Sequence, residues 1–150
     1  MSLKIGSIQA KLDLIADYLN ELEPLAILSV NEIIGDVYKY RAAERLQELI
    51  IQASLDISRH LLKEQHQLDP KENASVFWEL ARLNIIPSDL GELLAKAASF
   101  RNVLVHIYEK INPEIVVDNI PLILRDFPEF SSCIYDYLDS LEVSNDDTES

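Results

Sequence analysis

Apolar residues recur at intervals of three and four along most of this chain, and residues that favour turns are scarce. The first such stretch contains Ile5, Ile8, Leu12, Ile15, Leu19 and Leu22. At 3.6 residues per turn, this spacing places the apolar side chains on one face of a helix. Only three glycines occur in 150 residues, and strand patterns that alternate with turn signals are absent from the sequence. The sequence therefore predicts an all-α fold.

The length and charge of the chain limit its architecture and its partners. With 150 residues, 48% of them hydrophobic, the chain can build one domain around one core. Its 13 basic and 26 acidic residues give a net charge of −13. This acidity argues against nonspecific coating of nucleic acid or of an anionic membrane surface. Any contact with nucleic acid must therefore be local.

The sequence does not predict a secreted or membrane-spanning protein. No run of about 18 apolar residues occurs, and the N-terminus lacks the basic, apolar and small-residue pattern of a signal sequence. The single cysteine, Cys133, cannot form an internal disulfide. We therefore expect a cytoplasmic protein that does not contact a membrane.

Helix-start and helix-stop residues divide the chain into four or five helices, one of them long. The predicted helices cover residues 3–23, 30–65, 70–83, 87–110 and 113–141. Asp69 is the expected N-cap of the third helix, with Pro70 at its first position. Pro121 and Pro128 fall inside the last helix, where we expect a kink or a break. Residues 1–141 form the predicted helical domain, and residues 142–150 form an acidic tail that we expect to be disordered.

The stretch SFRNVLVHIYEK, residues 99–110, places a cationic and a titratable residue in an apolar helix. Asn102 and His106 are four residues apart and lie on one face of a regular helix. Arg101 and His106 are about 140° apart around the helix axis and do not point at one target. An irregularity near residues 100–101, a two-fold interface between subunits, or both would bring these two side chains together.

An imidazole and a guanidinium together suit the cleavage of RNA by its own 2′-hydroxyl. The imidazole of His106 titrates near neutral pH and can move a proton, while Arg101 is a permanent cation that matches phosphate oxygens. In this reaction a base deprotonates the 2′-hydroxyl, an acid protonates the leaving 5′-oxygen, and a cation stabilises the phosphorane. The products are a 2′,3′-cyclic phosphate and a 5′-hydroxyl. The reaction needs no metal, and DNA lacks the nucleophile.

The motif RNVLVHIY, residues 101–108, matches the R-x4-H-x-Y signature of HepT-like toxins, which are small α-helical ribonucleases of the HEPN superfamily. The segment YRAAERLQELIIQASLDISRHLL, residues 40–62, is similar to the long helix that precedes this signature in the family. The resemblance covers about residues 3–140. It implies a single-domain HEPN-type helical bundle that forms a homodimer.

The resemblance also implies a function and a partner. Such a protein is the toxin of a type VII toxin–antitoxin pair, a metal-independent endoribonuclease without a cofactor that cleaves tRNA or mRNA. Arg101 and His106 would be its catalytic residues, and Asn102 would be a polar helper. Tyr108 would accept AMP groups from a minimal nucleotidyltransferase antitoxin, an MntA-like protein. Each AMP adds a phosphate and a bulky base two residues from His106, which would exclude an RNA phosphate.

Two histidines and an aspartate of the long helix admit structural and functional interpretations. His60 and His66 are six residues apart rather than the four that converge on zinc, so we expect no metal site. Asp56 stands four residues before His60. We expect Asp56 to form a salt bridge or hydrogen bond rather than to support an RNA cleft.

Three arginines of the same helix, Arg41, Arg45 and Arg59, have two possible roles. They could contact an RNA backbone, or they could form solvent-exposed ion pairs with Glu44 or Glu48.

Two other functions remain open. The bundle can be a noncatalytic binding module that assists a separate nucleotidyltransferase, a role that related helical bundles play when fused to such enzymes. It can also be a dimeric scaffold without a ligand. Expression of the chain without its antitoxin separates the toxin from the helper, since a toxin arrests growth and a helper does not.

Overall fold

The computed structural model describes residues 3–105 and 112–149, and within these ranges the chain forms six helices and no strand. The helices are α1 (Ile5–Ala26), α2 (Val30–Ile34), α3 (Val37–His66), α4 (Asn73–Arg82), α5 (Ser88–Val105) and α6 (Pro113–Glu149). The prediction of an all-α bundle is confirmed, but the described residues form six helices where four or five were expected, and both α3 and α6 are long. Among the helices described, none combines the length and the apolar character that a membrane crossing requires.

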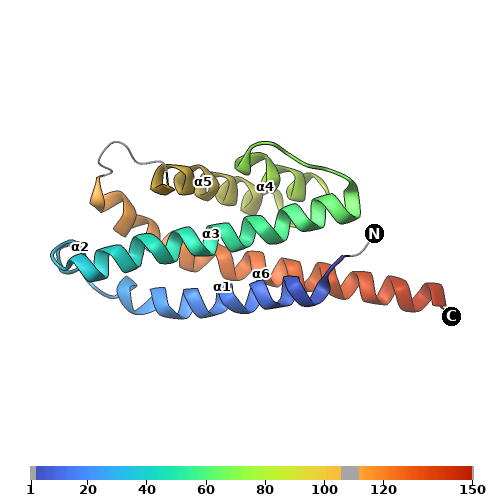
Figure 1. Ribbon diagram of the computed structural model, residues 1–150, viewed down its shortest axis with the longest axis horizontal. Helices are drawn as coiled ribbons and strands as arrows, with labels where there is room; N and C mark the ends of the chain where they lie inside the picture. Colours follow the sequence, from blue (N-terminus) through green and yellow to red (C-terminus); the bar gives the residue numbers. More distant parts are fainter. Residues whose placement is uncertain (1–2, 106–111, 150) are drawn as a thin grey trace.

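Helix α3 is the centre of the bundle. It contacts α1 and α6 as well as the α4–α5 pair, and in Figure 1 these two groups lie on opposite sides of it. Ile50 and Ile57 of α3 are fully buried. Phe77 of α4 packs edge-to-face against Phe130 of α6, with ring centroids 6.0 Å apart. One hydrophobic core therefore joins all six helices.

The expected helix over residues 30–65 is two helices, α2 and α3. Ser29 and Glu32 form a capping box at the start of α2, in which each side chain bonds the other residue's backbone N–H at 3.1 Å. Asp36 caps α3, since its carboxylate accepts from the backbone N–H of Tyr38 at 2.9 Å. The two caps separate the helices at Gly35 and Asp36. Apolar residues keep a helical spacing across this break, which is why the spacing alone predicted one helix.

The prediction that Asp69 and Pro70 begin a helix is wrong, because α4 begins at Asn73. Arg59 of α3 explains the difference. Its Nη1 donates to the carbonyl of Pro70 at 2.6 Å, and its Nη2 donates to Oδ1 of Asn73 at 2.9 Å. These bonds to another helix hold residues 69–72 in a non-helical conformation.

Helix α6 is continuous through Pro121 and Pro128, so the expected break is wrong. The first turns of α6 lie at an angle to its long remainder, which agrees with a kink (Figure 1). The helix continues to Glu149, so residues 143–149 are helical where the sequence predicted a disordered tail. No glycine or proline follows Pro128 to stop the helix.

The side chain of Gln47 connects α3 to the start of α6. It is fully buried, and its Nε2 donates to the carbonyl of Val116 at 2.9 Å. Its Oε1 accepts from Nδ2 of Asn119 at 3.0 Å. As predicted, Asn112 precedes the first turn of α6, and its Oδ1 accepts from the backbone N–H of Glu114. These bonds fix the beginning of α6 against α3.

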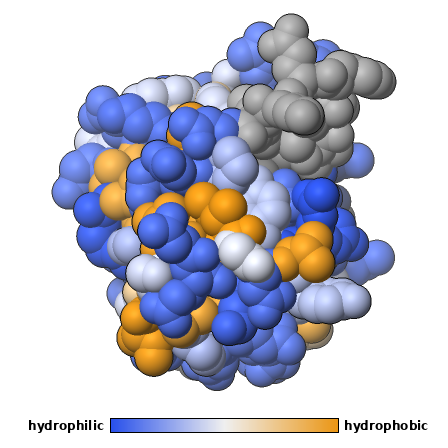
Figure 2. Space-filling model, turned by 90° about the vertical axis from the view of Figure 1, so that its left-hand side faces the viewer, coloured by the Kyte–Doolittle hydropathy of each residue, from blue (hydrophilic) through white to orange (hydrophobic). Residues whose placement is uncertain are grey.

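The end of the molecule that bears α2 has a mixed surface. Figure 2 views this end and shows several apolar patches with hydrophilic side chains between them. Ile27, Ile34 and Val37, in and next to α2, are large apolar residues exposed to solvent. This end therefore offers small apolar contacts rather than one broad apolar face.

Candidate active site

The described part of the candidate motif lies at the end of α5. Arg101 is half-buried and Asn102 is exposed. The Nε atom of Arg101 is buried and has no hydrogen-bond partner among the described residues. A buried cationic donor is stabilised when an anion accepts its hydrogen bond. His106 and Tyr108 lie outside the described residues, so their positions relative to Arg101 stay predictions.

A chain of hydrogen bonds joins this motif to α3 and α4. Nδ2 of Asn73, at the start of α4, donates to Oδ1 of Asn102 at 3.2 Å. Oδ1 of Asn73 accepts from Nη2 of Arg59 at 2.9 Å. Asn73 therefore uses both ends of its amide, and it connects Arg59 of α3 with Asn102 of α5.

A hollow of about 480 Å³ opens beside these hydrogen bonds. Its lining comes from residues 71–74 and from Ser99 and Asn102 of α5. Lys71 and Glu72 bring one positive and one negative charge to it. The hydroxyl of Ser99 donates to the carbonyl of Ala95 at 3.2 Å. The amides of Asn73 and Asn102 and the ammonium of Lys71 are thus the donor groups among the residues that line the hollow.

Close packing of α4 against α5 sets the distance between Asn73 and Asn102. Gly91 lies where the two helices approach, and a Cβ atom at this position would come within 2.8 Å of the Cβ of Ala81. Gly91 therefore has no side chain for a packing reason, although glycine lowers helix propensity. The α4–α5 pair is the unit that carries the candidate site.

Asn73 is the candidate site residue that the sequence analysis missed. It was expected inside a helix that began at residue 70, and nothing near it in the sequence points to Asn102, which lies 29 residues later. The role of Arg59 was also left open. It pairs with neither Glu44 nor Glu48 and instead donates to Pro70 and Asn73. Only the packing of α3, α4 and α5 brings the three side chains together.

The other two arginines of α3 form the ion pairs that were one of their expected roles. Nη1 of Arg41 lies 2.6 Å from Oε1 of Glu44, and Nη1 of Arg45 lies 3.0 Å from Oε1 of Glu48. The pair with Glu44 raises the pKa of Arg41, mainly through their hydrogen bond. Both arginines are therefore paired with carboxylates on the exposed side of α3, and a role in RNA binding stays a prediction.

Asp56 forms the hydrogen bond that was expected of it. Its Oδ1 accepts from Nε2 of Gln52 at 2.7 Å, and its Oδ2 lies 3.9 Å from the ammonium of Lys11 in α1. The expected partner four residues on, His60, instead accepts the backbone N–H of Lys4 at its Nε2, 3.0 Å away. Asp56 and His60 therefore fasten α1 to α3 and do not belong to the hollow.

Neither histidine of α3 is placed as a metal ligand. Nε2 of His66 lies 3.3 Å from the hydroxyl of Tyr137 in α6. Within the ranges that the structure describes, no three His, Cys, Asp or Glu side chains are grouped as metal ligands. The polar groups that line the hollow are the amides of Asn73 and Asn102, the hydroxyl of Ser99, one ammonium and one carboxylate.

Comparison with known proteins places the fold and the motif in one family. A family model described as Ribonuclease HepT-like matches residues 15–134. A tRNA nuclease HepT of Aphanizomenon flos-aquae is 32% identical over 139 residues, which are 93% of this chain and 95% of that protein. An mRNA nuclease HepT of Shewanella oneidensis is 30% identical over 115 residues, which are 72% of this chain and 86% of that protein.

The fold also agrees with a solved structure. A tri-AMPylated HEPN toxin of Shewanella oneidensis, solved in complex with an MNT antitoxin, superposes with a TM-score of 0.78 at 24% identity. The match covers 90% of this chain and 98% of the toxin chain. The helical bundle and the family match over residues 15–134, a segment whose sequence contains the R-x4-H-x-Y motif, show that this chain belongs to the ribonuclease HepT-like family.

Proposed function

We propose that this protein is a metal-independent endoribonuclease and the toxin of a toxin–antitoxin pair. The observation that carries this proposal is the end of α5, where the buried Nε of Arg101 has no partner in the described part of the chain and the next residue, Asn102, is hydrogen-bonded to Asn73. Two relatives are named as nucleases of tRNA and of mRNA. The substrate is accordingly an RNA of one of these two classes.

Arg101 and His106 are the proposed catalytic residues. The guanidinium of Arg101 binds the scissile phosphate and stabilises the charge that builds up on the phosphorane. The imidazole of His106 transfers the proton, from the 2′-hydroxyl or to the leaving 5′-oxygen. The Oδ1 of Asn102 accepts from Asn73, and its amide N–H groups, which donate to no acceptor among the described residues, would orient the phosphate.

The charge distribution near the hollow supports local binding of a phosphate by an otherwise acidic protein. Lys71 lines the hollow, Arg59 belongs to its hydrogen-bond chain, and Arg101 directly precedes Asn102 in α5. The carboxylates of the same segments are those of Asp69 and Glu72. This is a small excess of positive charge on a chain whose net charge is −13. RNA is therefore held by a few contacts at the site rather than by the protein surface as a whole.

The proposed active form is a homodimer. On a regular helix Arg101 and His106 point about 140° apart, and a two-fold axis beside α5 would place Arg101 of one subunit opposite His106 of the other. The dimer cleft then holds two composite sites. Such a cleft narrows the approach to the phosphate and concentrates the positive potential of both subunits.

Tyr108 is the proposed site of inhibition by a nucleotidyltransferase antitoxin. The toxin of similar fold from Shewanella oneidensis is tri-AMPylated and in complex with an MNT antitoxin. An AMP chain on Tyr108 would add negative charge two residues from His106 and would repel the substrate phosphate. We place the toxin and its antitoxin in the cytoplasm, where tRNA and mRNA occur.

Cleavage of total RNA by purified protein in EDTA tests the ribonuclease assignment. Wild type, His106→Ala and Arg101→Ala are compared, and intact mass first establishes that Tyr108 carries no AMP. We expect wild type to cleave and both variants to lose at least about a hundredfold in rate, the typical share of one general acid–base or oxyanion group. If wild type leaves RNA intact, the ribonuclease assignment fails and the noncatalytic helper of a nucleotidyltransferase takes its place.

A further inference from the structure

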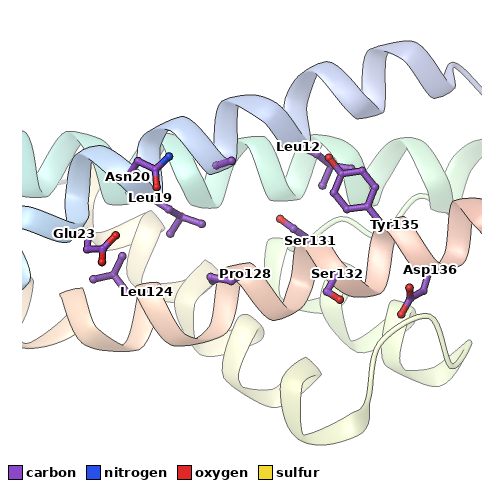
Figure 3. A pocket seen from close by; sticks show the side chains of 11 residues that line it. Leu12, Leu19, Asn20, Glu23, Leu124, Pro128, Ser131, Ser132, Tyr135 and Asp136 are labelled. Carbon is purple, nitrogen blue, oxygen red and sulfur yellow. The ribbon is translucent and has the colours of Figure 1, made fainter.

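A groove of about 630 Å³ runs between α1 and α6. All of its lining residues belong to these two helices, so it is separate from the hollow at α4 and α5. Figure 3 shows α1 along one edge, α6 along the other and α3 behind. Leu12 and Leu19 of α1 and Leu124 of α6 supply apolar side chains.

The length of the groove suits a helix of about three turns. The lining residues of α1 extend from Leu12 to Glu23, a rise of about 16 Å at 1.5 Å per residue. An amphipathic helix that places its apolar face in such a groove is a common mode of peptide recognition. The groove is open along its side, which suits a polypeptide better than an enclosed small molecule.

One hydroxyl without a described partner and two carbonyls that lack their usual helical N–H belong to residues that line the groove. The hydroxyl oxygen of Ser131 is buried and has no partner among the described residues, and in Figure 3 it points toward α1. Pro24 and Pro128 lie inside their helices and have no N–H to bond the carbonyl four residues earlier. Those carbonyls belong to Asn20 and Leu124, and both residues line the groove. A partner with side-chain donors would satisfy these acceptors.

The charged residues that line the groove are both acidic. Glu23 lies at one end, Asp136 lies at the other, and the lining contains no Lys or Arg. Asp139 is exposed and lies one turn after Tyr135 on the same face of α6, so the negative charge continues beyond the groove. A second copy of this chain would bring the same carboxylates together. A cationic partner is therefore favoured over self-association.

From these features we infer that the α1–α6 groove binds a basic amphipathic helix of a partner protein. Leucine-like side chains of that helix occupy the apolar floor, and its Lys or Arg side chains bond the free acceptors and pair with Glu23 and Asp136. This inference does not depend on the ribonuclease assignment, because the groove shares no residue with the candidate active site.

Two synthetic peptides of identical composition test this inference. Each has 12 residues of leucine, alanine and lysine. One arranges leucines on one helical face and lysines beside them, and the other scrambles the order. Binding of labelled peptide to the full chain is followed by fluorescence anisotropy at about 0.15 M salt, where long-range charge effects are screened. We expect the amphipathic peptide to bind at least about tenfold more tightly than the scrambled one.

Charge reversals in matched pairs locate the binding. Glu23→Lys with Asp136→Lys reverses the lining charges, whereas Glu21→Lys with Glu129→Lys makes the same change at exposed positions outside the lining. We expect the first pair to weaken peptide binding about tenfold and the second by no more than about twofold. Ala16→Trp fills the groove without a change of charge, and it should weaken peptide binding about as much as the first pair of charge reversals does.

Three results would overturn the inference. Equal binding of the two peptides, or equal weakening of binding by both pairs of charge reversals, would show that the attraction depends only on net charge. Alternatively, Ala16→Trp changes the molar mass measured by light scattering, in which case the groove is a contact between copies of this chain. Far-UV circular dichroism of each variant establishes that it is folded.

Discussion

At the scale of single residues, the candidate site depends on one amide that donates and accepts at once. Asn73 accepts from Arg59 at 2.9 Å and donates to Asn102 at 3.2 Å. A carboxylate of the same size and shape can only accept hydrogen bonds, so an amide is needed to accept one and donate the other. In the proposed site, Asn73 would be a positioning residue that acts on the substrate phosphate through Asn102.

Asn73→Asp tests this role, because it keeps the bond from Arg59 and removes the bond to Asn102. One hydrogen bond contributes about 1 kcal/mol, so we expect RNA cleavage to slow by roughly fivefold to tenfold. The thermal unfolding midpoint should move little, since Asn73 is not fully buried. Asn20→Asp in α1 makes the same chemical change far from the site and should leave the cleavage rate unaltered. Equal slowing in both variants would show that only the added charge matters.

At the scale of helices, two local interactions determine where α2 begins and how closely α4 packs against α5. The capping box of Ser29 and Glu32 starts α2, and Gly91 allows α4 to approach α5. Each of these interactions involves few atoms and can be tested by a single substitution.

The capping box predicts the pH dependence of α2. Hydrogen bonds from the backbone and side chain of Ser29 lower the pKa of Glu32 below its ordinary value. Because the pKa of Glu32 is lower in the folded than in the unfolded state, the ionised carboxylate stabilises the fold fully at pH values above the unfolded pKa. This stabilisation is lost as the pH falls through the folded pKa. NMR titration of the Glu32 carboxyl should show this lowered pKa in wild type and a smaller lowering in Ser29→Ala, which loses the hydroxyl but keeps the backbone N–H that donates to the carboxylate. An ordinary pKa of Glu32 in wild type would contradict the capping box.

The α4–α5 contact predicts that Gly91→Val is destabilising. The Cβ of any residue at this position meets Ala81, and a branched side chain must push the two helices apart. Overpacking of this kind costs about 1–3 kcal/mol in the free energy of unfolding, which urea denaturation measures. Separation of α4 from α5 should also slow RNA cleavage, because it lengthens the Asn73–Asn102 bond. Gly6→Val, where a Cβ meets nothing within 4 Å, is the matched control.

At the scale of the whole molecule, the sequence predicted the class of fold and most of the helices, since apolar spacing reflects the single core around α3. It did not predict the break at Gly35 and Asp36, because apolar spacing continues across it. It placed the start of α4 too early, because the Arg59 bond to Pro70 joins residues 11 apart in sequence. The motif predicts Arg101 and Asn102 as site residues, whereas the contact of Asn73 with Asn102 becomes evident only when the helices are packed together.

The dimer prediction belongs to this scale as well. If each active site takes Arg101 from one subunit and His106 from the other, a mixture of inactive Arg101→Ala and inactive His106→Ala subunits regains activity. Random pairing gives about half mixed dimers with one intact site each, so we expect about a quarter of wild-type activity. Coexpression of the two variants and assay of the purified mixture measures this. Absence of recovery would place both residues of each site in one subunit.

The chemistry of the newly made RNA ends tests the proposed ribonuclease mechanism most directly. Unmodified protein is incubated in EDTA with an RNA oligonucleotide and with the same sequence made of 2′-deoxynucleotides, and the products are identified by mass spectrometry. Attack by the 2′-hydroxyl, assisted by Arg101 and His106, predicts 2′,3′-cyclic phosphate and 5′-hydroxyl ends from RNA and no cleavage of the deoxy strand. Products with 5′-phosphate ends, or cleavage of the deoxy strand, would contradict it.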